Sequence, residues 1–384
     1  MNSLWLVMQA VLSLFSIVLP LKKSRIIFNS TGNKNYNFNS RFLFEYMVDR
    51  DKGEREILFV INDKAKREEL IKSGVTGVIN ANSISGIFLC LTAKVWVCST
   101  IESPVFSLIR KKNRIVYHLG HGIPLKNIGL AENNISLLRR VNRHIRLRLF
   151  THVTCYSDLF MPVLSNAFRN KFAVYLKFGQ PRNDFLIKSA NQHSDILSIP
   201  IEGRVNKILY SPTWRPYAET QFFPFADMCV KTLHDFLEKT NSIIYLRPHP
   251  YYPAIIDETL YTSPRVIYMG CDVITDITPN LDCFNILVTD YSSVFLDFYA
   301  LDNKAVIFIP YDLVKYEGLV GFSVPYEMLT KGEHVCSLSG FLKNIEIAIN
   351  NSGDNYGNIR KLLNIKSDGN CLEHFLEIER LRVL

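Results

Sequence analysis

The sequence lacks the motifs of several common classes of protein. None of its eight cysteines forms a Cys-x-x-Cys pair, and no His/Cys spacing suits a structural zinc ion. It has no Walker-type glycine loop, no acidic cluster obviously arranged to hold magnesium, and no nucleic-acid-binding motif. Several cysteines fall in apolar runs, which indicates buried thiols in a reducing compartment. We therefore expect a protein without a metal, a cofactor or a nucleic-acid partner.

The chain has a full apolar core and an uneven charge. Its 384 residues allow two domains of ordinary size, and 48% of them are hydrophobic. The net charge is +8, but residues 1–190 hold 28 Lys/Arg and 12 Asp/Glu (+16), whereas residues 191–384 hold 16 and 24 (−8). This asymmetry indicates an anionic partner for the first half, such as anionic lipid or a polyanionic substrate.

The N-terminal segment, "MNSLWLVMQAVLSLFSIVLPLKKSR", has the pattern of a membrane-binding helix. It has no signal-peptide cleavage site, and its apolar run at 3–19 is at the lower limit for a membrane span. Three polar residues fall on one helical stripe: Gln9, Ser13 and Ser16. Basic residues follow Pro20: Lys22, Lys23 and Arg25. The pattern favours a helix lying in the interface of an anionic membrane. The alternatives are a helix buried in the protein and, less favoured, a true span.

Short apolar runs alternate with polar or amphipathic stretches along the chain. The expected strands are "RIIFNS", "EILFVIN", "AKVWVCS", "RIVYHLG", "THVTCYS" and "FAVYLKFG", then "KILYSPT", "SIIYLRPH", "RVIYMG", "ILVTDYS" and "AVIFIP". This alternation predicts an α/β fold with parallel sheets covered by helices on both faces. A polar segment at roughly 187–206 is the expected boundary, which gives a helix at 1–21 and domains at 22–190 and 191–384. We expect two doubly wound Rossmann-like domains that face a cleft, with ligands beyond the carboxyl ends of the strands.

One turn is unusually rich in glycine and histidine. "YHLGHGIPLKNIG" begins as a strand and continues as a loop at its carboxyl end. Gly120 and Gly122 flank His121, which allows a ligand to approach the backbone closely. Lys126 can reach an anion. His118 lies inside the strand and is more typical of a structural residue, whereas the loop position of His121 favours function.

Further polar residues follow strands in the second half. "YLRPHP" places Arg247 two residues before His249, and its guanidinium can grip phosphate oxygens. "LVTDYSSVFLDF" places Ser292 and Ser293 at a helix start, where hydroxyl and backbone N–H groups can face an anion. The turns "LYSPTWRP" and "FGQPRNDF" contribute further candidates, for which plain turn chemistry is the alternative: Ser211, Thr213, Arg215, Arg182 and Asp184. Together these residues predict a phosphate-handling site.

A second basic surface is expected at "LLRRVNRHIRLRLF". As a helix this stretch is amphipathic, and it carries five arginines: Arg139, Arg140, Arg143, Arg146 and Arg148. A solvated basic face and a surface for anionic lipid or polymer are both consistent with this pattern.

In this order, the motifs resemble the CDP-glycerol glycerophosphotransferases of teichoic-acid and capsule synthesis. "GHGIPLKNIG" is similar to the family's Trp-His-Gly-Thr-Pro-Leu-Lys loop. "QPRND", "ILYSPTWR", "LRPHP" and "DCFNILVTDYSSVFLDF" are similar to further blocks, and the resemblance covers roughly residues 24–335. Two positions depart from the family pattern: Gly120 stands where Trp is usual, and Val320 stands where Arg is usual.

The resemblance implies a GT-B fold, with an acceptor-side domain at 22–190 and a donor-binding domain at 191–384. The reaction would move an alditol phosphate from CDP-glycerol or CDP-ribitol to a hydroxyl of a lipid-linked acceptor and release CMP. His121 and His249 would be the catalytic residues, the first as general base and the second at the pyrophosphate. The remaining roles would be donor binding by Arg247, Ser292, Ser293, Thr213, Arg215 and Asp290, and acceptor or phosphate binding by Lys126, Arg182 and Asp184. The enzyme would work peripherally at the cytoplasmic face of the cell membrane.

Two other functions remain open on the sequence alone. A GT-B glycosyltransferase that uses a nucleotide sugar would share the same cleft and pyrophosphate grip. A membrane-bound scaffold could bind anionic polymer through the basic half of the chain. The two histidine loops argue against the scaffold, since a scaffold needs no base.

Overall fold

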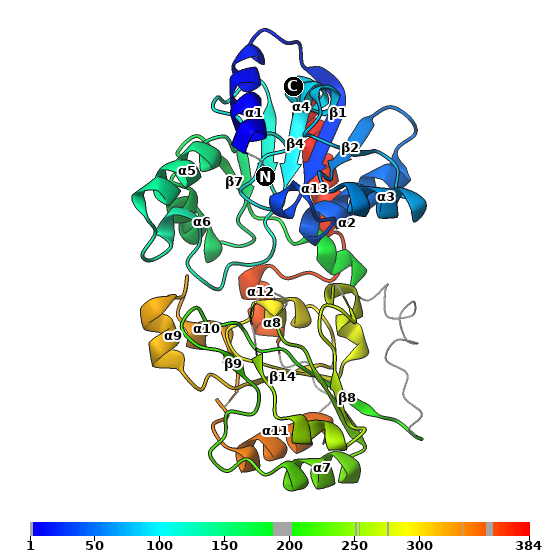
Figure 1. Ribbon diagram of the computed structural model, residues 1–384, viewed down its shortest axis with the longest axis vertical. Coiled ribbons are helices and arrows are strands. Elements are labelled where there is room, and N and C mark those ends of the chain that lie inside the picture. Colours follow the sequence, from blue (N-terminus) through cyan, green and yellow to red (C-terminus); the bar gives the residue numbers. More distant parts are fainter. Residues whose placement is uncertain are drawn as a thin grey trace. The chain divides into compact units, whose positions relative to one another are not determined.

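A computed structural model describes residues 3–186, 202–249, 252, 254–274, 276–332, 334–350 and 356–384 (Figure 1). The chain divides into two compact units. The first unit holds Met1–Ile123, Asn127–Asp184 and Leu362–Leu384, and the second holds Pro124–Lys126 and Phe185–Lys361. Two assignments differ from the expected boundaries. The C-terminal segment belongs to the first unit rather than the second, and Pro124–Lys126 belongs to the second rather than the first.

The first unit is built on a seven-stranded parallel sheet with the order β3-β2-β1-β4-β5-β6-β7. Its strands are β1 (Lys22–Asn29), β2 (Glu56–Val60), β3 (Val78–Ile79), β4 (Ala93–Cys98), β5 (Ile115–His118), β6 (His152–Thr154) and β7 (Val174–Leu176). All six strands expected in this half are present, and only the two-residue β3 was missed. β4 is buried along its whole length, as a continuous apolar run predicts for a central strand.

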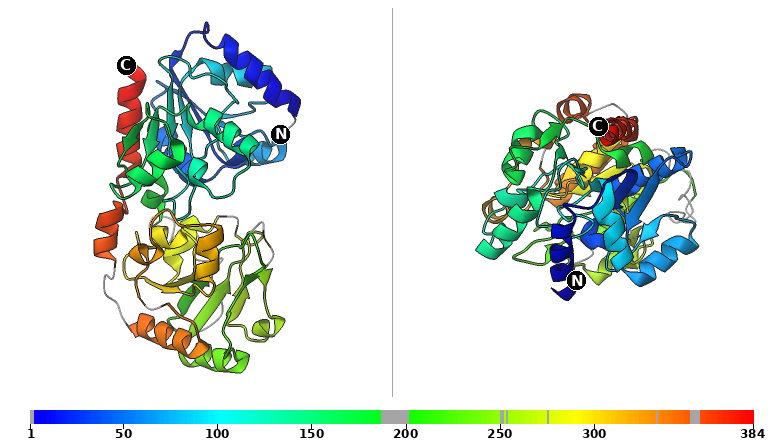
Figure 2. Two further views of the ribbon diagram at one scale, coloured as in Figure 1. Left: turned by 90° about the vertical axis from the view of Figure 1, so that its left-hand side faces the viewer. Right: turned by 90° about the horizontal axis from the view of Figure 1, so that it is seen from above.

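Helices cover both faces of this sheet (Figure 2). They are α1 (Ser3–Phe15), α2 (Phe38–Arg50), α3 (Lys64–Lys72), α4 (Ile84–Thr92), α5 (Leu137–Leu147), α6 (Phe160–Phe168) and α13 (Asn370–Val383). Residues 102–112, which connect β4 to β5, form no helix. Helix α13 packs against α2, β1 and β4, on the opposite face of the sheet from α1 (Figure 2). This packing is why the end of the chain belongs to the first unit.

Helix α1 turns its polar stripe toward the protein and its apolar face outward. Gln9 Nε2 donates to Ala81 O over 3.1 Å, and Gln9 Oε1 accepts from Phe106 N over 2.9 Å. Ser13 Oγ accepts from Leu108 N over 3.2 Å. The exposed apolar residues of this segment are Val7, Val11, Leu14, Phe15, Ile17 and Val18. Within the described residues, no helix has both the length and the apolar character needed to cross a membrane.

The second unit is built on a five-stranded parallel sheet with the order β12-β10-β8-β13-β14. Its strands are β8 (Asn206–Tyr210), β10 (Ser242–Leu246), β12 (Val266–Tyr268), β13 (Ile286–Thr289) and β14 (Ala305–Phe308), and all five were expected. A separate pair joins β9 (Thr220–Gln221) and β11 (Ala254–Ile255). Parallel strands end at the same edge of a sheet, so the turns after β8, β10 and β13 gather their side chains together.

The helices of the second unit include α7 (Val230–Lys239), α8 (Val294–Phe298), α9 (Leu313–Leu319), α10 (Tyr326–Leu329) and α11 (Leu338–Asn350), and α12 (Gly357–Leu363) spans the boundary of the two units. The notable feature before α7 is that residues 222–229 are not helical, although a helix over 222–239 is expected from the sequence pattern. The reason is that Phe222, Phe223 and Phe225 pack into the core of this unit as an irregular segment.

Candidate functional site

The histidine loop follows β5 in the first unit. Gly120 has a φ of 74°, and a Cβ at this position would lie 1.8 Å from the Tyr156 hydroxyl. A side chain cannot be placed there while Tyr156 keeps its position, which accounts for glycine at residue 120. The ring of His121 is exposed, and its centroid lies 5.5 Å from that of Phe38.

The pKa of His121 lies below the ordinary histidine value of 6.5. Desolvation by the surrounding protein is the main cause, and the positive charge of Arg182 adds to it. A hydrogen bond to the backbone of Ser99 acts in the opposite direction. At neutral pH the imidazole is therefore uncharged and able to accept a proton.

His118 is a structural residue, as its place inside a strand indicates. Its ring is buried between Phe150 and Phe168, with edge-on contacts at 5.1 Å and 4.9 Å between ring centroids. Burial lowers the pKa of His118 to about 3, so the ring is neutral at physiological pH.

Arg182 and Asp184 lie in a short 3-10 helix (Pro181–Phe185), and both are turned into the first unit. Arg182 Nη1 donates to the carbonyl oxygen of His121 over 3.0 Å. Asp184 accepts from the backbone N–H groups of Asn370 (3.0 Å) and Cys371 (2.7 Å), and thereby caps α13. The expected role of Asp184 as an acceptor or phosphate ligand does not fit this carboxylate, because the helix start already uses it.

Lys126 lies in the second unit, not on the acceptor side as expected. Its backbone forms an antiparallel bridge with Phe322, and Ser323 N donates to Leu125 O over 2.9 Å. The Lys126 ammonium lies 5.7 Å from the ring centroid of Trp214 and 5.5 Å from that of Tyr316. Desolvation lowers the pKa of Lys126 to about 8. A half-buried cation beside aromatic rings in this way is well placed to receive an anion.

His249 follows β10 and is close to Lys126. Its ring centroid lies 6.2 Å from that of Trp214 and 5.4 Å from that of Tyr252, and these two rings stack on each other at 4.3 Å. Desolvation, together with the charges of Lys126 and Arg247, lowers the pKa of His249 to about 4. The structure therefore groups His249 and Lys126, which were expected in different domains.

Arg247 is mostly buried beneath this group. Its Nη1 donates to the carbonyl oxygens of Met269 (3.2 Å) and Ile274 (2.9 Å), in the loop after β12. Burial lowers the pKa of this guanidinium. Arg247 therefore stabilises the loop after β12 with one of its nitrogen atoms, Nη1.

The serines at the start of α8 are half-buried at the carboxyl end of β13. Helix α8 has five residues, and the Ser293 hydroxyl makes no capping hydrogen bond to it. Thr213, at the end of β8, is held by a 2.7 Å hydrogen bond from its N–H to Asp290 Oδ1. Ser292, Ser293 and Thr213 therefore lie at the strand ends where the sequence placed them.

Arg215 and Asp290 form the buried support of this edge instead of facing a ligand. Arg215 donates to Asp290 Oδ2 over 2.7 Å and to both carboxylate oxygens of Asp312, over 2.9 Å and 3.0 Å. Its side chain is fully buried, with a relative exposure of 0%. Asp312 was given no role from the sequence, and neither were Tyr217 and Tyr291, whose hydroxyls donate to it. The assignment of Arg215 and Asp290 to direct donor contact is thus corrected to a supporting position.

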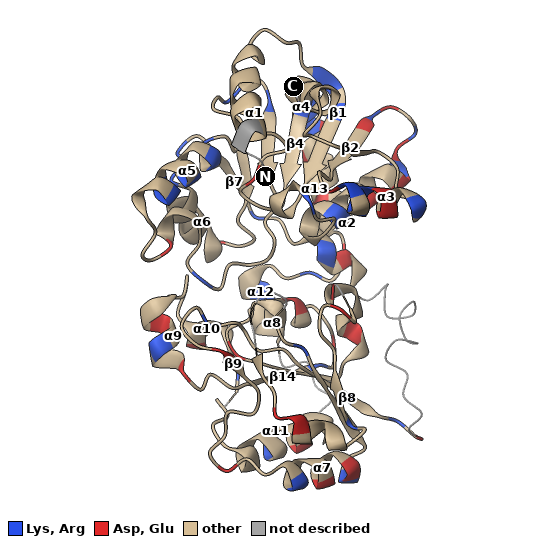
Figure 3. Cartoon of the chain, viewed as in Figure 1, with Lys and Arg blue, Asp and Glu red and all other residues tan. Residues whose placement is uncertain are grey.

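Helix α5 carries basic residues (Figure 3), of which some are buried and others exposed. Arg143 is buried and donates to Glu132 over 2.7 Å. Leu137, Leu138 and Val141, which the amphipathic pattern offered for packing, are exposed. The exposed side of α5 therefore combines apolar and basic residues.

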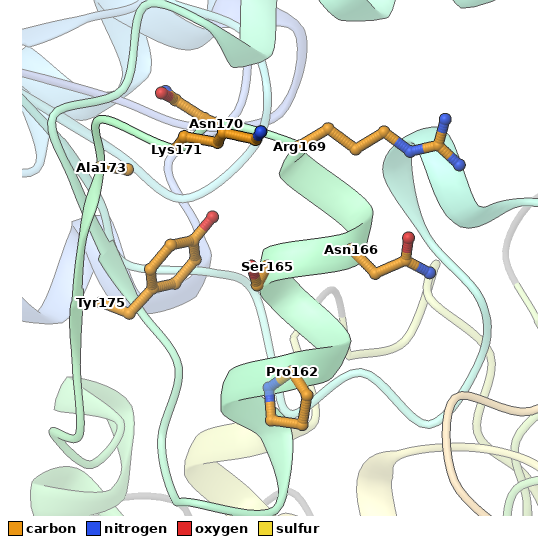
Figure 4. Close-up of a pocket in the computed structure, with 8 residues that line it drawn as sticks. All are labelled: Pro162, Ser165, Asn166, Arg169, Asn170, Lys171, Ala173 and Tyr175. Carbon is orange, nitrogen blue, oxygen red and sulfur yellow. The ribbon is translucent and has the colours of Figure 1, made fainter.

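An open hollow of about 770 Å³ lies beside α6 and β7 in the first unit (Figure 4). Its lining includes two basic residues, Arg169 and Lys171, and two hydroxyl residues, Ser165 and Tyr175. The two cations follow the C-terminus of α6, where the helix dipole favours positive charge. This placement explains them without a ligand. No group of three or more His, Cys, Asp or Glu side chains that could hold a metal ion is found in the part of the chain that the structure describes.

Parallel sheets with histidine, lysine, arginine and hydroxyl groups at their strand ends define an α/β enzyme that handles phosphate. The family model for CDP-glycerol:poly(glycerophosphate) glycerophosphotransferase matches residues 11–376, so the chain belongs to that family. The resemblance seen in the motifs is thereby confirmed, and with it the enzyme class.

Named relatives agree with this assignment. The chain is 27% identical over 329 residues to a teichoic acid poly(glycerol phosphate) polymerase of Bacillus spizizenii, covering 82% of this chain and 81% of that one. It is 27% identical over 354 residues to a teichoic acid glycerol-phosphate transferase of Staphylococcus aureus, covering 85% of each. It spans only 42% of a polymerase of Bacillus subtilis. The wall teichoic acid polymerase TagF, in a variant soaked with CDPG, has the same fold, with a TM-score of 0.75, 20% identity and coverage of 94% and 90%.

Proposed function

We propose that the protein transfers glycerol phosphate or ribitol phosphate from a CDP-alditol to a hydroxyl of a lipid-linked cell-surface polymer. The acceptor oxygen attacks the β-phosphorus, and a new O–P bond forms as the bond from that phosphorus to the bridging oxygen breaks. CMP leaves with the bridging oxygen, and the acceptor proton passes to a base. The observation that carries this proposal is the pair of histidine loops at strand ends in a chain of this family.

His121 is the proposed base. Its ring is exposed, its lowered pKa keeps it neutral at pH 7, and the carbonyl oxygen of the same residue is held by Arg182. A positioned base of this kind contributes roughly 10²- to 10⁴-fold to a rate.

His249, Lys126, Ser292 and Ser293 are the proposed contacts of the donor pyrophosphate. Negative charge grows on the phosphate oxygens and on the departing CMP during transfer. A cation such as Lys126 and an imidazole that becomes protonated when the anion arrives would stabilise that charge, each by on the order of 3 kcal/mol. The buried side chains of Arg247 and Arg215 would hold the segments that carry these contacts in place.

We also propose that the enzyme meets its acceptor at the cytoplasmic face of the cell membrane. The donor is a soluble nucleotide, whereas the proposed acceptor is attached to lipid, so the protein has to work at the surface between them. The outward apolar face of α1 and the exposed leucines and arginines of α5 supply a surface for anionic lipid.

A donor assay tests the proposed reaction. Purified full-length protein is incubated with lipid-linked acceptor and, separately, with CDP-glycerol, CDP-ribitol or UDP-sugars, and the released nucleotide is quantified. Formation of CMP with either CDP-alditol, coupled to growth of the acceptor, is the expected result. Transfer from a UDP-sugar alone would identify a glycosyltransferase. Binding of polymer with no turnover of any donor would indicate a scaffold.

A further inference from the structure

We propose that Asn39 and Phe38, at the start of α2, are positioning residues for the catalytic imidazole. The inference rests on the proposed role of His121 as base. Neither residue was assigned a role from the sequence, and Asn39 lies 81 positions before Gly120 of the histidine loop. They act on it through two kinds of contact, hydrogen bonds to the backbone and packing against the ring.

The first contact is a set of hydrogen bonds that links Asn39, Arg182 and the backbone on both sides of His121. Asn39 Nδ2 donates to Gly120 O over 2.9 Å, and Asn39 Oδ1 accepts from Arg182 N over 3.3 Å. Arg182 Nη1 in turn donates to His121 O over 3.0 Å. The carbonyl groups on both sides of the His121 Cα are therefore held, one by the Asn39 amide and one by the Arg182 guanidinium. Because Asn39 is fully buried, loss of its side chain removes both bonds in the protein interior, where an unmade hydrogen bond is costly.

The second contact is the packing of Phe38 against the imidazole. Phe38 has a φ of 57°, a left-handed conformation that is unfavourable for a bulky side chain and persists only where the surroundings enforce it. In this conformation the Phe38 ring packs against the His121 ring. The two ring centroids are 5.5 Å apart, and the ring planes are tilted by 46°. A strained residue in direct contact with a proposed base indicates function rather than packing alone.

Ser99, after β4, joins these two contacts. Its hydroxyl accepts from Ser40 N over 2.8 Å and donates to Ser40 Oγ over 2.8 Å, which fixes the first turn of α2. Its backbone also takes part in the hydrogen bond that partly opposes the lowering of the His121 pKa by desolvation. An imidazole that donates to a backbone carbonyl from one nitrogen keeps the other nitrogen free to accept a proton. The start of α2 and the histidine loop thus share one anchor at the end of β4.

A buried asparagine can also serve stability alone, and the chain offers a matched control for that case. Asn170 lies in the same unit, is likewise buried and also bonds to the backbone: it donates to the carbonyl oxygens of Leu147 (3.1 Å) and Phe150 (2.7 Å) and accepts from Phe172 N (3.2 Å). It has no part in the histidine loop. Asn39→Ala and Asn170→Ala therefore remove comparable hydrogen bonds, but only the first removes support from His121.

The test compares turnover, donor affinity and thermal stability of the full-length variants. Asn39→Ala and Phe38→Ala should each lower kcat by roughly 10- to 10²-fold, the scale of a misplaced catalytic group. CDP affinity, measured by calorimetry, should stay at the wild-type value because the proposed donor contacts lie in the second unit. Phe38→Tyr retains the ring and should keep kcat near the wild-type value. Asn170→Ala should lower the melting temperature while leaving kcat unchanged.

A double-variant cycle with His121→Ala separates the possible results. If Asn39 acts through His121, Asn39→Ala should cost nothing further in the His121→Ala background. An equal loss in both backgrounds, or wild-type kcat in Asn39→Ala and Phe38→Ala, would overturn the positioning role. Phe38 is half-buried, so Phe38→Ala keeps the inference testable if Asn39→Ala does not fold. Wild-type turnover in His121→Ala would instead refute the proposed base itself.

Discussion

Arg215 donates a 2.7 Å hydrogen bond to Asp290 and grips Asp312 with the other side of its guanidinium. The three side chains come from the ends of β8, β13 and β14, so one buried cation ties three strand ends together. Asp290 also accepts from the backbone N–H groups of Thr213 (2.7 Å) and Tyr291 (2.5 Å). The segments that carry the proposed phosphate ligands are thereby fixed to one another.

Replacement of Arg215 should loosen this edge of the second unit. Arg215→Ala leaves two carboxylates without their cation, and breaking a buried ion pair costs about 3–5 kcal/mol. Hydrogen exchange should show faster opening of β8 and β13, and CDP binding should weaken. Arg215→Lys keeps the charge but lacks the fork needed to reach both carboxylates, so we expect an intermediate effect. Lys231→Ala removes an exposed pair with Asp235 and should change neither measurement. Wild-type exchange rates in Arg215→Ala would contradict the supporting role.

Donor binding should be coupled to proton uptake. Before binding, the pKa of His249 is about 4 and that of Lys126 about 8. An arriving pyrophosphate favours the charged form of both groups and so raises both pKa values. A group whose pKa rises on binding takes up protons, and affinity therefore falls as pH rises from the free to the bound pKa. For His249 this window begins near pH 4, and for Lys126 it begins near pH 8.

Calorimetry of CDP binding in buffers of different ionisation enthalpy measures this uptake. We expect net proton uptake at both pH 6 and pH 8.5. His249→Gln should remove the uptake at pH 6, and Lys126→Arg should remove it at pH 8.5 while retaining much of the affinity, because arginine does not titrate there. Binding with no proton uptake at either pH would place the pyrophosphate away from these two side chains.

The fall of kcat/KM at acid pH should reflect the protonation of His121. A general base works only when it is unprotonated, so activity is lost as pH falls through its pKa. Because the pKa of His121 is lowered from the ordinary histidine value, kcat/KM should decline at a lower pH than an unperturbed histidine would give. His121→Ala should lower kcat by ~10²-fold or more and abolish this decline. A decline that is unchanged in His121→Ala would assign it to another group.

The strands and the chemistry of their ends could be predicted from the sequence because both depend on local patterns. Apolar runs of four to eight residues gave all eleven expected strands, and glycine, proline and histidine marked the turns. The two-residue β3 carries too little pattern to be seen, and the capping of α13 by Asp184 joins residues far apart in sequence. The same limit explains Lys126, whose place beside His249 depends on a bridge to Phe322.

The functional roles of buried polar residues were the least predictable part. Arg215 and Asp290 follow strands just as Ser292 and Ser293 do, so their position in the sequence could not show which pair is buried. That depends on a partner, Asp312, ninety-seven residues from Arg215. Asn39 and Phe38 carry no local signal for function either, since an asparagine at a helix start is common.

The outward apolar face of α1 should bind anionic membranes. Its polar stripe is hydrogen-bonded to residues 81–108, so deletion of the helix would leave those partners unpaired and confuse binding with stability. Substitution of the exposed face avoids this problem: Phe15→Ser, Ile17→Ser and Val18→Ser combined. Burial of such side chains is worth about 1.5–3 kcal/mol each. The triple variant should therefore sediment far less with anionic liposomes and keep its CDP affinity.

Ile71 provides the matched control, because it is also exposed, at 56% against 63% for Phe15, but lies on α3. Ile71→Ser should sediment like the wild type. Wild-type binding should strengthen with anionic lipid and weaken at high salt, since each basic residue near the surface contributes about 1 kcal/mol. Full sedimentation of the triple variant would show that α1 is not the anchor. The wild-type protein could instead fail to bind liposomes and form a dimer in solution that the triple variant does not form. That result would identify the apolar face as a contact between copies of this chain.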